Sequence, residues 1–377
     1  MATIAYERPN QHPKFAPHAW RRDSLRPGSF AVLVNANARG FQKALRQGVF
    51  NDIPEEDLYL SKSLDDANSL VAEIVDRGYS TVFASGGDGS ITQLLNELRT
   101  ATPDPKRQPR VGILRMGTGN AIADFIDVDS AINDARRIGR GTAFERVNLS
   151  LIESEGRLCP FAGCGTDAGV LNDYIALKSQ VAGTPLEQTM TGVRGYLMAG
   201  ILKTAPEALS PSKRRRVFAI NDGPAAYAVD SRGQVIETFR RGAVLYSGDC
   251  IMAGASSIPN YGYKLRMFPS ATRFPGFFQV RVANMNPLMA VARLGKLWKG
   301  QLERKHGVHD FLVQKVRFEF DADVPFHLAG DAEGYRREVT MQLSDREFEF
   351  VRPVDQVADV LAHPSVQSWF NPAPAAA

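Results

Sequence analysis

The chain has 377 residues, of which 44% are hydrophobic and 23% charged, and a formal net charge of +4 at pH 7. These values are typical of a folded protein of two domains, and they exclude the disordered and fibrous classes. The small basic excess does not by itself indicate nucleic-acid binding. Three cysteines without paired spacing argue against a disulfide framework or a zinc site, and they favour a reducing cytoplasm.

The first 29 residues are rich in proline, arginine and polar residues. They contain no apolar stretch long enough for a signal peptide, so we expect a flexible N-terminal tail. No window in the chain approaches the roughly 18 uninterrupted apolar residues of a membrane span. We therefore expect a cytoplasmic protein that meets a membrane only peripherally, at its inner surface.

Between residues 30 and 148, short β-branched runs alternate with helical patterns. Strands are predicted at FAVLV, DLYLS, STVFAS and RVGILRM. Apolar spacing predicts a helix over residues 65–77, a helix that buries Ile91, Leu94, Leu95 and Leu98, and a helix that buries Ile122, Phe125 and Ile126. This alternation is typical of an α/β domain with a parallel sheet and helices on both faces.

The pattern changes near residue 147. VNLSLIESEGRLCPFAG contains two strand-like runs joined by the turn SEG, which is a hairpin signature. Short strand-like runs with turn signals between them predict a β-rich second domain; they are RRVFAIND, AAYAVD, GAVLYSG, YKLRMFP, FFQVRVAN, KVRFEFD and EVTMQLS. Helical insertions are expected at about residues 170–203 and 287–303, and the segment after residue 353 looks helical again.

Two glycine-bearing turns, at residues 86–90 and 116–120, follow the third and fourth predicted strands. Ligands of parallel α/β sheets bind beyond the carboxyl ends of the strands. Glycines there let backbone N–H groups approach phosphate oxygens, and the next helix adds the partial positive charge of its first turn. Asp88 would repel a phosphate, so it indicates Mg²⁺ or a proton-transfer role, unless it only caps the helix.

Other nucleotide and metal fingerprints are weaker. The P-loop pattern is absent, and GCGTDA at residues 163–168 follows a hairpin instead of opening a βαβ unit, which argues against NAD or FAD. The six histidines include no H-x-x-x-H or H-E pair, so a catalytic metal held by histidine is not expected.

Four motifs resemble those of the diacylglycerol kinase catalytic domain family, which includes bacterial diacylglycerol and lipid kinases, sphingosine kinases and ceramide kinases. They are NANARG at residues 35–40, SGGDGS at 85–90, MGTGNAIA at 116–123 and FHLAGDAEGY at 326–335. GGDG alone also occurs in NAD kinases and phosphofructokinases, and the companion GTGN favours the lipid kinases.

The resemblance implies transfer of the γ-phosphoryl group of ATP to a lipid hydroxyl, with Mg²⁺ as cofactor. It also implies an α/β ATP-binding domain at residues 30–148, of the type found in NAD kinases and diacylglycerol kinases. A β-sandwich acceptor domain would follow at 149–351, with the active site in the cleft between the two domains. Residues 352–377 would return to the first domain.

The family's site residues, carried over position by position, form three groups. Asp331 would activate the lipid hydroxyl or hold Mg²⁺, with Glu333 close by, and Asp88 is the rival for both roles. Asp167 matches a position near the acceptor pocket, with a turn-stabilising role as the alternative. The nucleotide is expected to contact Asn35, Arg39, Ser63, Gly86, Gly87, Asp88, Gly89, Gly117, Thr118 and Asn120.

Four departures from the family pattern predict local differences. Ala36 replaces a proline and is expected to loosen the first turn. Ala121 replaces an aspartate of many bacterial members, so a metal contact is expected to be missing. Ala332 replaces the glycine of D-G-E, so the turn that carries Asp331 cannot freely use φ > 0. Residues 272–278 lack the carboxylates that hold a structural magnesium in several bacterial members, and no structural metal is expected there.

Two basic stretches could contact anionic lipid, namely SKRRRV at residues 212–217 and the amphipathic pattern at 286–307. Their alternatives are a solvated loop and a helix packed on its own domain. The sequence predicts an ATP- and Mg²⁺-dependent lipid kinase with transient membrane contact, no nucleic-acid partner, and homodimerisation left open. A small-molecule kinase of NAD-kinase type and a binding relative without turnover remain as alternatives.

Overall fold

The computed structural model describes residues 21–24, 29–38, 40–116, 120–141, 143–165, 168, 215–262, 264–286, 289 and 292–354. Several expectations lie outside these residues. They are the roles of Arg39, Gly117, Thr118 and Asp167, the helix expected at 170–203, and the segment after residue 354.

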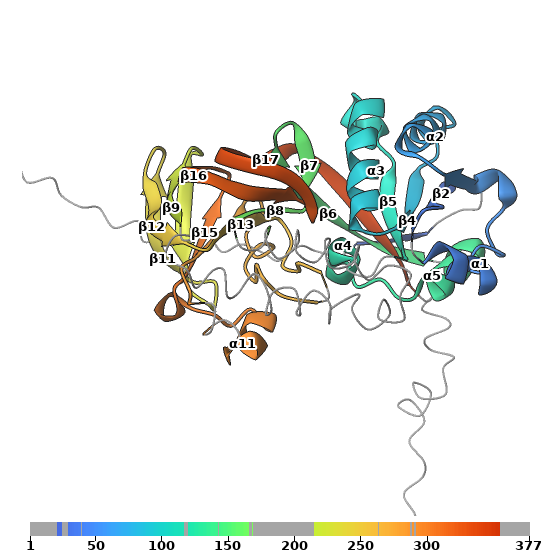
Figure 1. Ribbon diagram of the computed structural model, residues 1–377. Coiled ribbons are helices and arrows are strands. Elements are labelled where there is room, and N and C mark those ends of the chain that lie inside the picture. Colours follow the sequence, from blue (N-terminus) through green and yellow to red (C-terminus); the bar gives the residue numbers. More distant parts are fainter. Residues whose placement is uncertain are drawn as a thin grey trace, which may run out of the picture.

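The N-terminal part of the chain is an α/β domain on a parallel sheet, as predicted (Figure 1). Its strand order is β3-β2-β4-β5, and β17 extends the sheet in parallel beside β5. The four strands are β2 (Phe30–Asn35), β3 (Leu58–Ser61), β4 (Thr81–Gly86) and β5 (Arg110–Arg115). Runs of Val, Ile, Leu and Phe favour such strands because helices bury both faces of a parallel sheet.

Helices cover both faces of this sheet, again as predicted. One face packs Leu33, Ala84 and Ile113 against α2 and α3, and the predicted Ile91, Leu94, Leu95 and Leu98 are all buried there. The other face packs against α1 and α5, two short helices that the sequence patterns did not predict. The helices are α1 (Phe41–Arg46), α2 (Leu64–Asp76), α3 (Asp88–Ala101), α4 (Ala121–Phe125) and α5 (Ala131–Gly139).

The remaining described chain is β-rich, which confirms the second half of the fold prediction. The predicted hairpin is formed by β6 and β7, with Glu155 and Gly156 at φ 51° and 74° in its turn. The strands are β6 (Ala143–Ser154), β7 (Arg157–Cys159), β8 (Phe161–Gly165), β9 (Arg215–Asn221), β10 (Ala225–Val229), β11 (Val235–Arg240), β12 (Val244–Cys250), β13 (Met252–Ser256), β14 (Phe278–Ala283), β15 (Val308–Val313), β16 (Lys315–Leu328) and β17 (Asp331–Val354).

One strand prediction in this region is wrong. The described residues of YKLRMFP, 264–269, form turns instead: Lys264 has φ 60°, and the Leu265 amide donates to the Gly262 carbonyl. Its apolar side chains Leu265 and Phe268 are nevertheless buried, and Phe268 packs with Met252 and Leu302 in a small core of its own. Alternating apolar and polar residues therefore belong to a packed loop here and not to a strand.

The basic amphipathic pattern at residues 286–307 gives a shorter helix than expected among its described residues. α11 spans Leu294–Trp298, and Leu297 packs against the same small core as Phe268. This contact agrees with the reading in which the helix packs on its own domain.

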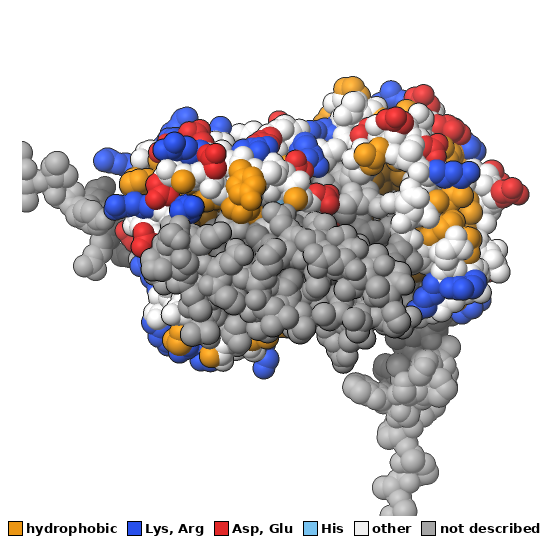
Figure 2. All heavy atoms as spheres, in the orientation of Figure 1, with side chains coloured by type: hydrophobic (Ala, Val, Ile, Leu, Met, Phe, Trp, Pro, Cys, Tyr) orange, Lys and Arg blue, Asp and Glu red, His pale blue; other side chains and the backbone are white. Residues whose placement is uncertain are grey.

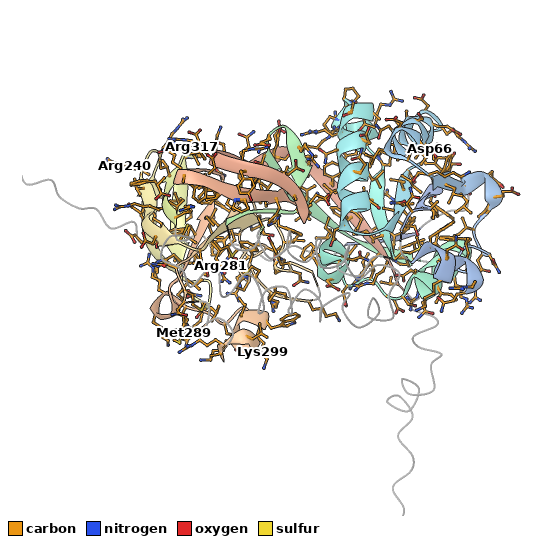
Figure 3. All side chains as sticks on the ribbon, viewed as in Figure 1. Asp66, Arg240, Arg281, Met289, Lys299 and Arg317 are labelled. Atoms are coloured by element: carbon orange, nitrogen blue, oxygen red, sulfur yellow. The ribbon has the colours of Figure 1, made fainter. Side chains whose placement is uncertain are left out.

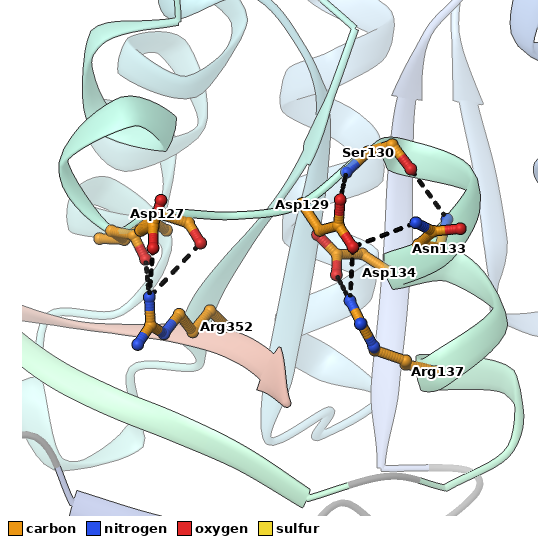
Figure 4. A network of polar contacts seen from close by, with 8 residues as sticks. Asp127, Asp129, Ser130, Asn133, Asp134, Arg137 and Arg352 are labelled. Atoms are coloured by element: carbon orange, nitrogen blue, oxygen red, sulfur yellow. Dashed lines mark hydrogen bonds and ion pairs between the residues drawn. The ribbon is translucent and has the colours of Figure 1, made fainter. Parts of the chain in front are cut away.

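Two strands join the halves of the molecule. β6 and β17 pair in antiparallel fashion along both halves, and β17 runs on from β16 to reach β5. β1 (Arg21–Ser24), within the segment expected to be a flexible tail, pairs with β6. Near the end of β17, Arg352 donates to Glu145 and to the Ile126 carbonyl, and it forms an ion pair with Asp127, as Figure 4 shows in part.

The β-rich half contains a buried ion pair between Arg281, which Figure 3 labels, and Asp310; the two residues are 1% and 7% exposed. The pair is bidentate, at 2.7 and 2.8 Å, and Gln279 adds a third hydrogen bond to Asp310. On the face seen in Figure 2, acidic and basic side chains are interspersed over the described surface. Of the described helices, none is long and apolar enough to cross a membrane.

Candidate active site

A cavity of about 830 Å³ opens at the carboxyl ends of β2, β3 and β4. It contains five of the residues predicted from the sequence, namely Asn35, Ser63, Gly87, Gly89 and Asp331. Asp331 belongs to β17 and the other four to the α/β domain, so the two halves of the chain meet in this cavity.

The first glycine turn leads from β4 directly into α3. None of Gly86, Gly87 and Gly89 has a positive φ, so their backbone conformations do not require glycine. Gly86 is required by space, because a Cβ there would lie 2.5 Å from the Oγ of Ser90. Gly87 is the N-cap of α3, and among the described residues no side chain caps this helix end. Gly87 and Gly89, which have no side chains, line the cavity at this first turn.

Asp88 joins the two glycine-bearing turns. Its two carboxylate oxygens accept from the Ala121 amide, at 2.7 and 3.0 Å, and thereby cap α4. Burial of the carboxyl group raises its pKa to about 7, although hydrogen bonds from Ala121 and Ile122 act in the opposite direction. The residue as a whole is half-buried.

Asn120 precedes α4 and is 2% exposed. Neither its Nδ2 nor its Oδ1 has a hydrogen-bond partner among the described residues. A buried amide in this state is costly unless something else satisfies it, which makes Asn120 a candidate ligand contact.

The NANARG turn is tied down more firmly than its sequence suggested. The Asn35 side chain donates to Ser90 Oγ at 2.9 Å and accepts from the Asn37 amide at 2.9 Å. The Ala36 amide donates to the Ser61 carbonyl at 2.9 Å, a hydrogen bond that proline could not make. That Ala36 loosens this turn relative to proline stays a prediction.

Ser63 has a helix-capping role in the structure. Its side chain accepts from the Asp66 amide at 3.1 Å, at the start of α2. Its place in the cavity lining leaves it available to a ligand as well.

Asp331 follows a two-residue hairpin turn between β16 and β17. Leu328 pairs with Asp331, and the turn residues Ala329 and Gly330 have φ 52° and 90°. The positive φ values thus fall before Asp331 and at Gly334, and Ala332 lies in β17 without one. The expected restriction from Ala332 is therefore wrong, because the turn does not use that residue.

The Asp331 carboxylate faces the first turn of α3. A Cβ built on Gly89 would lie 3.6 Å from Asp331 Oδ2. Desolvation raises the pKa of Asp331 and the charge of Glu333 acts in the same direction, whereas Arg157 and His327 lower it.

Glu333 forms an ion pair with Arg157, the first residue of β7. Three residues further along β17, Arg336 donates to both carboxylate oxygens of Glu155, in the turn that precedes β7. These two Arg–Glu pairs fasten the β6–β7 hairpin to the start of β17.

The carboxylates can serve magnesium only in a limited way. Among the described residues, no cluster of three or more His, Cys, Asp or Glu could hold a metal ion. Kinase magnesium commonly binds one or two carboxylates plus substrate phosphates, and Asp331 at the cavity wall fits that arrangement. Asp88 fits less well, because both of its oxygens already accept hydrogen bonds.

The structure also adds residues that the motifs did not indicate. Arg157 and Arg99 line the cavity, and Asn96 lies between them with its side chain bonded to the Leu158 backbone. Ser85 and Ser90 flank GGDG and could have been included from the motif itself. Arg157 follows the SEG turn with no local signal, since only the tertiary fold brings it to Asp331.

Comparison with known proteins supports the resemblance. Residues 30–150 match the family model of the diacylglycerol kinase catalytic domain. The chain is 24% identical over 271 residues to the probable lipid kinase YegS-like of Yersinia pestis (strain Pestoides F), which covers 71% of this chain and 77% of that protein. The same figures hold for the protein of that name in Yersinia pseudotuberculosis serotype O:1b (strain IP 31758).

Solved structures from Bacillus anthracis str. Sterne share the fold. One superposes with a TM-score of 0.59 at 15% identity and covers 88% of this chain and 98% of that chain. A diacylglycerol kinase from the same organism superposes with a TM-score of 0.53 at 12% identity, over 88% and 97% of the two chains. Residues 30–150 are thus similar to diacylglycerol kinase catalytic domains, and 71% of the chain is similar to a probable lipid kinase.

Proposed function

We propose that the protein is a lipid kinase that transfers the γ-phosphoryl group of ATP to a lipid hydroxyl in the 830 Å³ cavity. The observation that carries this proposal is the position of Asp331, whose carboxylate faces Gly89 at the open first turn of α3. A proton acceptor and a phosphate-binding helix end thereby lie on two walls of one cavity.

The phosphates of ATP would bind at the first turn of α3. An uncapped N-terminus offers backbone N–H groups and partial positive charge to an anion. α3 has 14 residues, enough for this effect, and Gly87 and Gly89 leave its approach free of side chains. Asn120, whose buried amide lacks a partner among the described residues, would contact the triphosphate from the second turn.

Asp331 is the better candidate for the general base. It lines the cavity, and burial raises the pKa of its carboxyl group, which makes the carboxylate a stronger proton acceptor. Asp88 is occupied at both oxygens by the Ala121 amide, so we assign it to the geometry of the two turns.

In the chemical step, one phosphorus–oxygen bond replaces another. The lipid hydroxyl oxygen forms a bond to the γ-phosphorus, the bond from that phosphorus to the bridging oxygen breaks, and ADP leaves. The hydroxyl proton passes to the Asp331 carboxylate. Mg²⁺, held by the substrate phosphates next to this carboxylate, would neutralise phosphate charge.

The acceptor is a diacylglycerol or a sphingoid or ceramide-type lipid, and the reaction would take place at the cytoplasmic face of a membrane. The support is the similarity to proteins named as lipid kinases and diacylglycerol kinases. The basic residues near α11, among them Lys296 and Lys299, could supply transient contact with anionic lipid.

Radiolabel transfer from [γ-³²P]ATP tests the proposal. The purified protein is incubated with Mg²⁺ and with separate acceptors: vesicles that contain diacylglycerol, ceramide or sphingosine, and soluble NAD. We expect label in one lipid class and none in NAD. Transfer to NAD alone would identify a small-molecule kinase instead.

Three variants test which aspartate is the general base. Asp331→Asn should lower turnover by about 10²–10⁴-fold with ATP binding retained, since it removes the proton acceptor only. Asp88→Asn should cost much less, and Asp345→Asn, an exposed position on β17, should cost nothing. Binding of ATP without turnover on any acceptor, in wild type and Asp331→Asn alike, would identify a binding protein.

A further inference from the structure

We propose that Arg157 binds the terminal phosphate of the bound nucleotide, and that Glu333 is a positioning residue that holds the Arg157 guanidinium at the cavity wall. This inference rests on the proposed kinase function and names a part of its site that the motifs do not contain.

Arg157 is placed at the cavity by a tight hairpin. Glu155 and Gly156 take left-handed conformations, at φ 51° and 74°, so that β7 begins at Arg157 immediately after the turn. Gly156 and Arg157 line the cavity together with Gly87, Gly89 and Asp331. The Arg157 side chain is 46% exposed, so a ligand in the cavity can reach it.

The hairpin is held in place from the opposite strand. Arg336 on β17 donates to both oxygens of Glu155, at 2.9 Å for the longer bond, and Glu333 accepts from Arg157 Nη1. A guanidinium carries five N–H donors in a planar fork, so one bond to Glu333 leaves donors for a phosphate. The ion pair therefore orients Arg157 without consuming it.

The other positively charged residue at the cavity, Arg99, is held by neighbouring groups of the hairpin. Among the described residues that line the cavity, the positively charged ones are Arg99 and Arg157. Arg99 donates to the Gly156 carbonyl and pairs with Glu153 at 3.5 Å, so it braces the hairpin. Arg157 is the one whose partner, Glu333, lies two residues from Asp331.

The charges fit a phosphoryl-transfer site. A triphosphate beside Asp331 and Glu333 meets two carboxylates, and a cation is needed to offset their repulsion. Arg157 and Asp331 line the same cavity, and the partner of Arg157, Glu333, lies two residues from Asp331 on β17. The guanidinium can therefore stabilise the charge on the transferred group.

Direct binding of ATP and ADP to the full chain tests the inference without turnover. Because the contact is to the terminal phosphate, Arg157→Ala should weaken ATP binding by about 10- to 100-fold and ADP binding by less than about 3-fold. Arg157→Lys should fall between, since it keeps the charge and loses the planar fork. Arg337→Ala is the matched control: it removes an exposed arginine of the same strand that does not line the cavity, and it should bind ATP as wild type does.

Glu333 is tested by a double-variant cycle. Glu333→Gln should weaken ATP binding by about 3- to 10-fold, and Arg157→Ala with Glu333→Gln should bind ATP no more weakly than Arg157→Ala alone. Glu333→Gln that abolishes turnover with unchanged ATP binding would show that Glu333 takes part in the reaction and would overturn its positioning role.

The outcomes separate this inference from the kinase proposal. Wild-type protein that binds neither nucleotide would overturn both. Wild-type protein that prefers ATP, with Arg157→Ala and Arg157→Lys that bind ATP as tightly or that lose ATP and ADP equally, would overturn the inference alone. Thermal unfolding of each variant excludes a general loss of structure.

Discussion

The Asp88 carboxylate and the Ala121 amide are joined by hydrogen bonds of 2.7 and 3.0 Å across 33 residues of sequence. This contact fixes the turn that opens α3 against the turn that opens α4. The two motifs SGGDGS and MGTGNAIA are therefore parts of one structure, held together by the residue that first suggested a metal.

Removal of this contact should loosen both turns together. Asp88→Ala leaves the Ala121 amide without its acceptor and should lower the free energy of unfolding by about 1–2 kcal/mol, the usual cost of a lost helix cap. Asp88→Asn keeps one acceptor oxygen and should lose less. Urea unfolding measures both values, and equal stability of Asp88→Ala and wild type would show that the contact does not hold the turns.

Gly86 and Gly89 should respond differently to alanine. A Cβ on Gly86 would lie 2.5 Å from Ser90 Oγ and 2.6 Å from Ser90 Cβ, so Gly86→Ala should cost about 1–3 kcal/mol through overpacking. Gly89→Ala would place its Cβ 3.6 Å from Asp331 Oδ2, an ordinary contact, and should leave the stability nearly unchanged. Thermal unfolding compares the two variants, and Ser90→Gly should partly rescue Gly86→Ala. A greater loss in Gly89→Ala would contradict this assignment.

Asp134 should make stability depend on pH. The side chain is fully buried beside Arg137 and Asp129, and burial raises its pKa to about 6 in spite of the Arg137 ion pair (Figure 4). The folded protein therefore holds this proton more tightly than the unfolded chain. The stabilisation is complete below the unfolded pKa near 4 and is lost as the pH rises through 6.

Asp134→Asn removes this dependence and keeps an acceptor for Arg137. Relative to the variant, wild type should lose at most roughly 3 kcal/mol of stability between pH 4 and pH 7. Urea unfolding of both proteins at pH 4, 5.5 and 7 measures the difference. Parallel stability curves for the two proteins would show that Asp134 titrates normally.

Arg346 should be important for stability out of proportion to its place in a strand. It is 9% exposed and donates to the carbonyls of Arg99 and Thr102, at the carboxyl end of α3. Arg346→Ala leaves these carbonyls unsatisfied and should lower the free energy of unfolding by about 2–3 kcal/mol. Arg337→Ala, an exposed arginine on the same strand, serves as the control and should stay within about 0.5 kcal/mol of wild type.

Periodicity predicted the parallel sheet and its long helices because burial dominates there. Ile91, Leu94, Leu95 and Leu98 repeat at helical spacing since α3 presents a single apolar face to the sheet. The six-residue α1 has less than two turns and no comparable repeat, so its sequence carried no such signal. YKLRMFP misled because burial in a packed loop selects the same apolar residues as a strand.

The motifs predicted which residues would line the same cavity, but they predicted the role of each residue less well. Asn35, Gly87, Gly89 and Asp331 do line one cavity, whereas Gly86 is needed for the packing of Ser90. Arg157 could not be predicted, because its position depends on a hairpin turn and on a β17 residue 176 positions away. Cross-strand pairs of this kind are set by tertiary register, which local pattern does not encode.

β17 has 24 residues and would span up to roughly 80 Å in a fully extended form, so a single strand carries Asp331 at one end and reaches β5 at the other. The two halves cannot rotate freely about β17, because bending this strand would break hydrogen bonds to its neighbouring strands. The pairing of β17 with β6 is interrupted between Leu343 and Glu347, and bending of β17 would be concentrated at this point. Arg346 lies in that interruption and donates to a carbonyl at the carboxyl end of α3. Relative movement of the two halves would therefore displace this helix, whose opposite end borders the cavity.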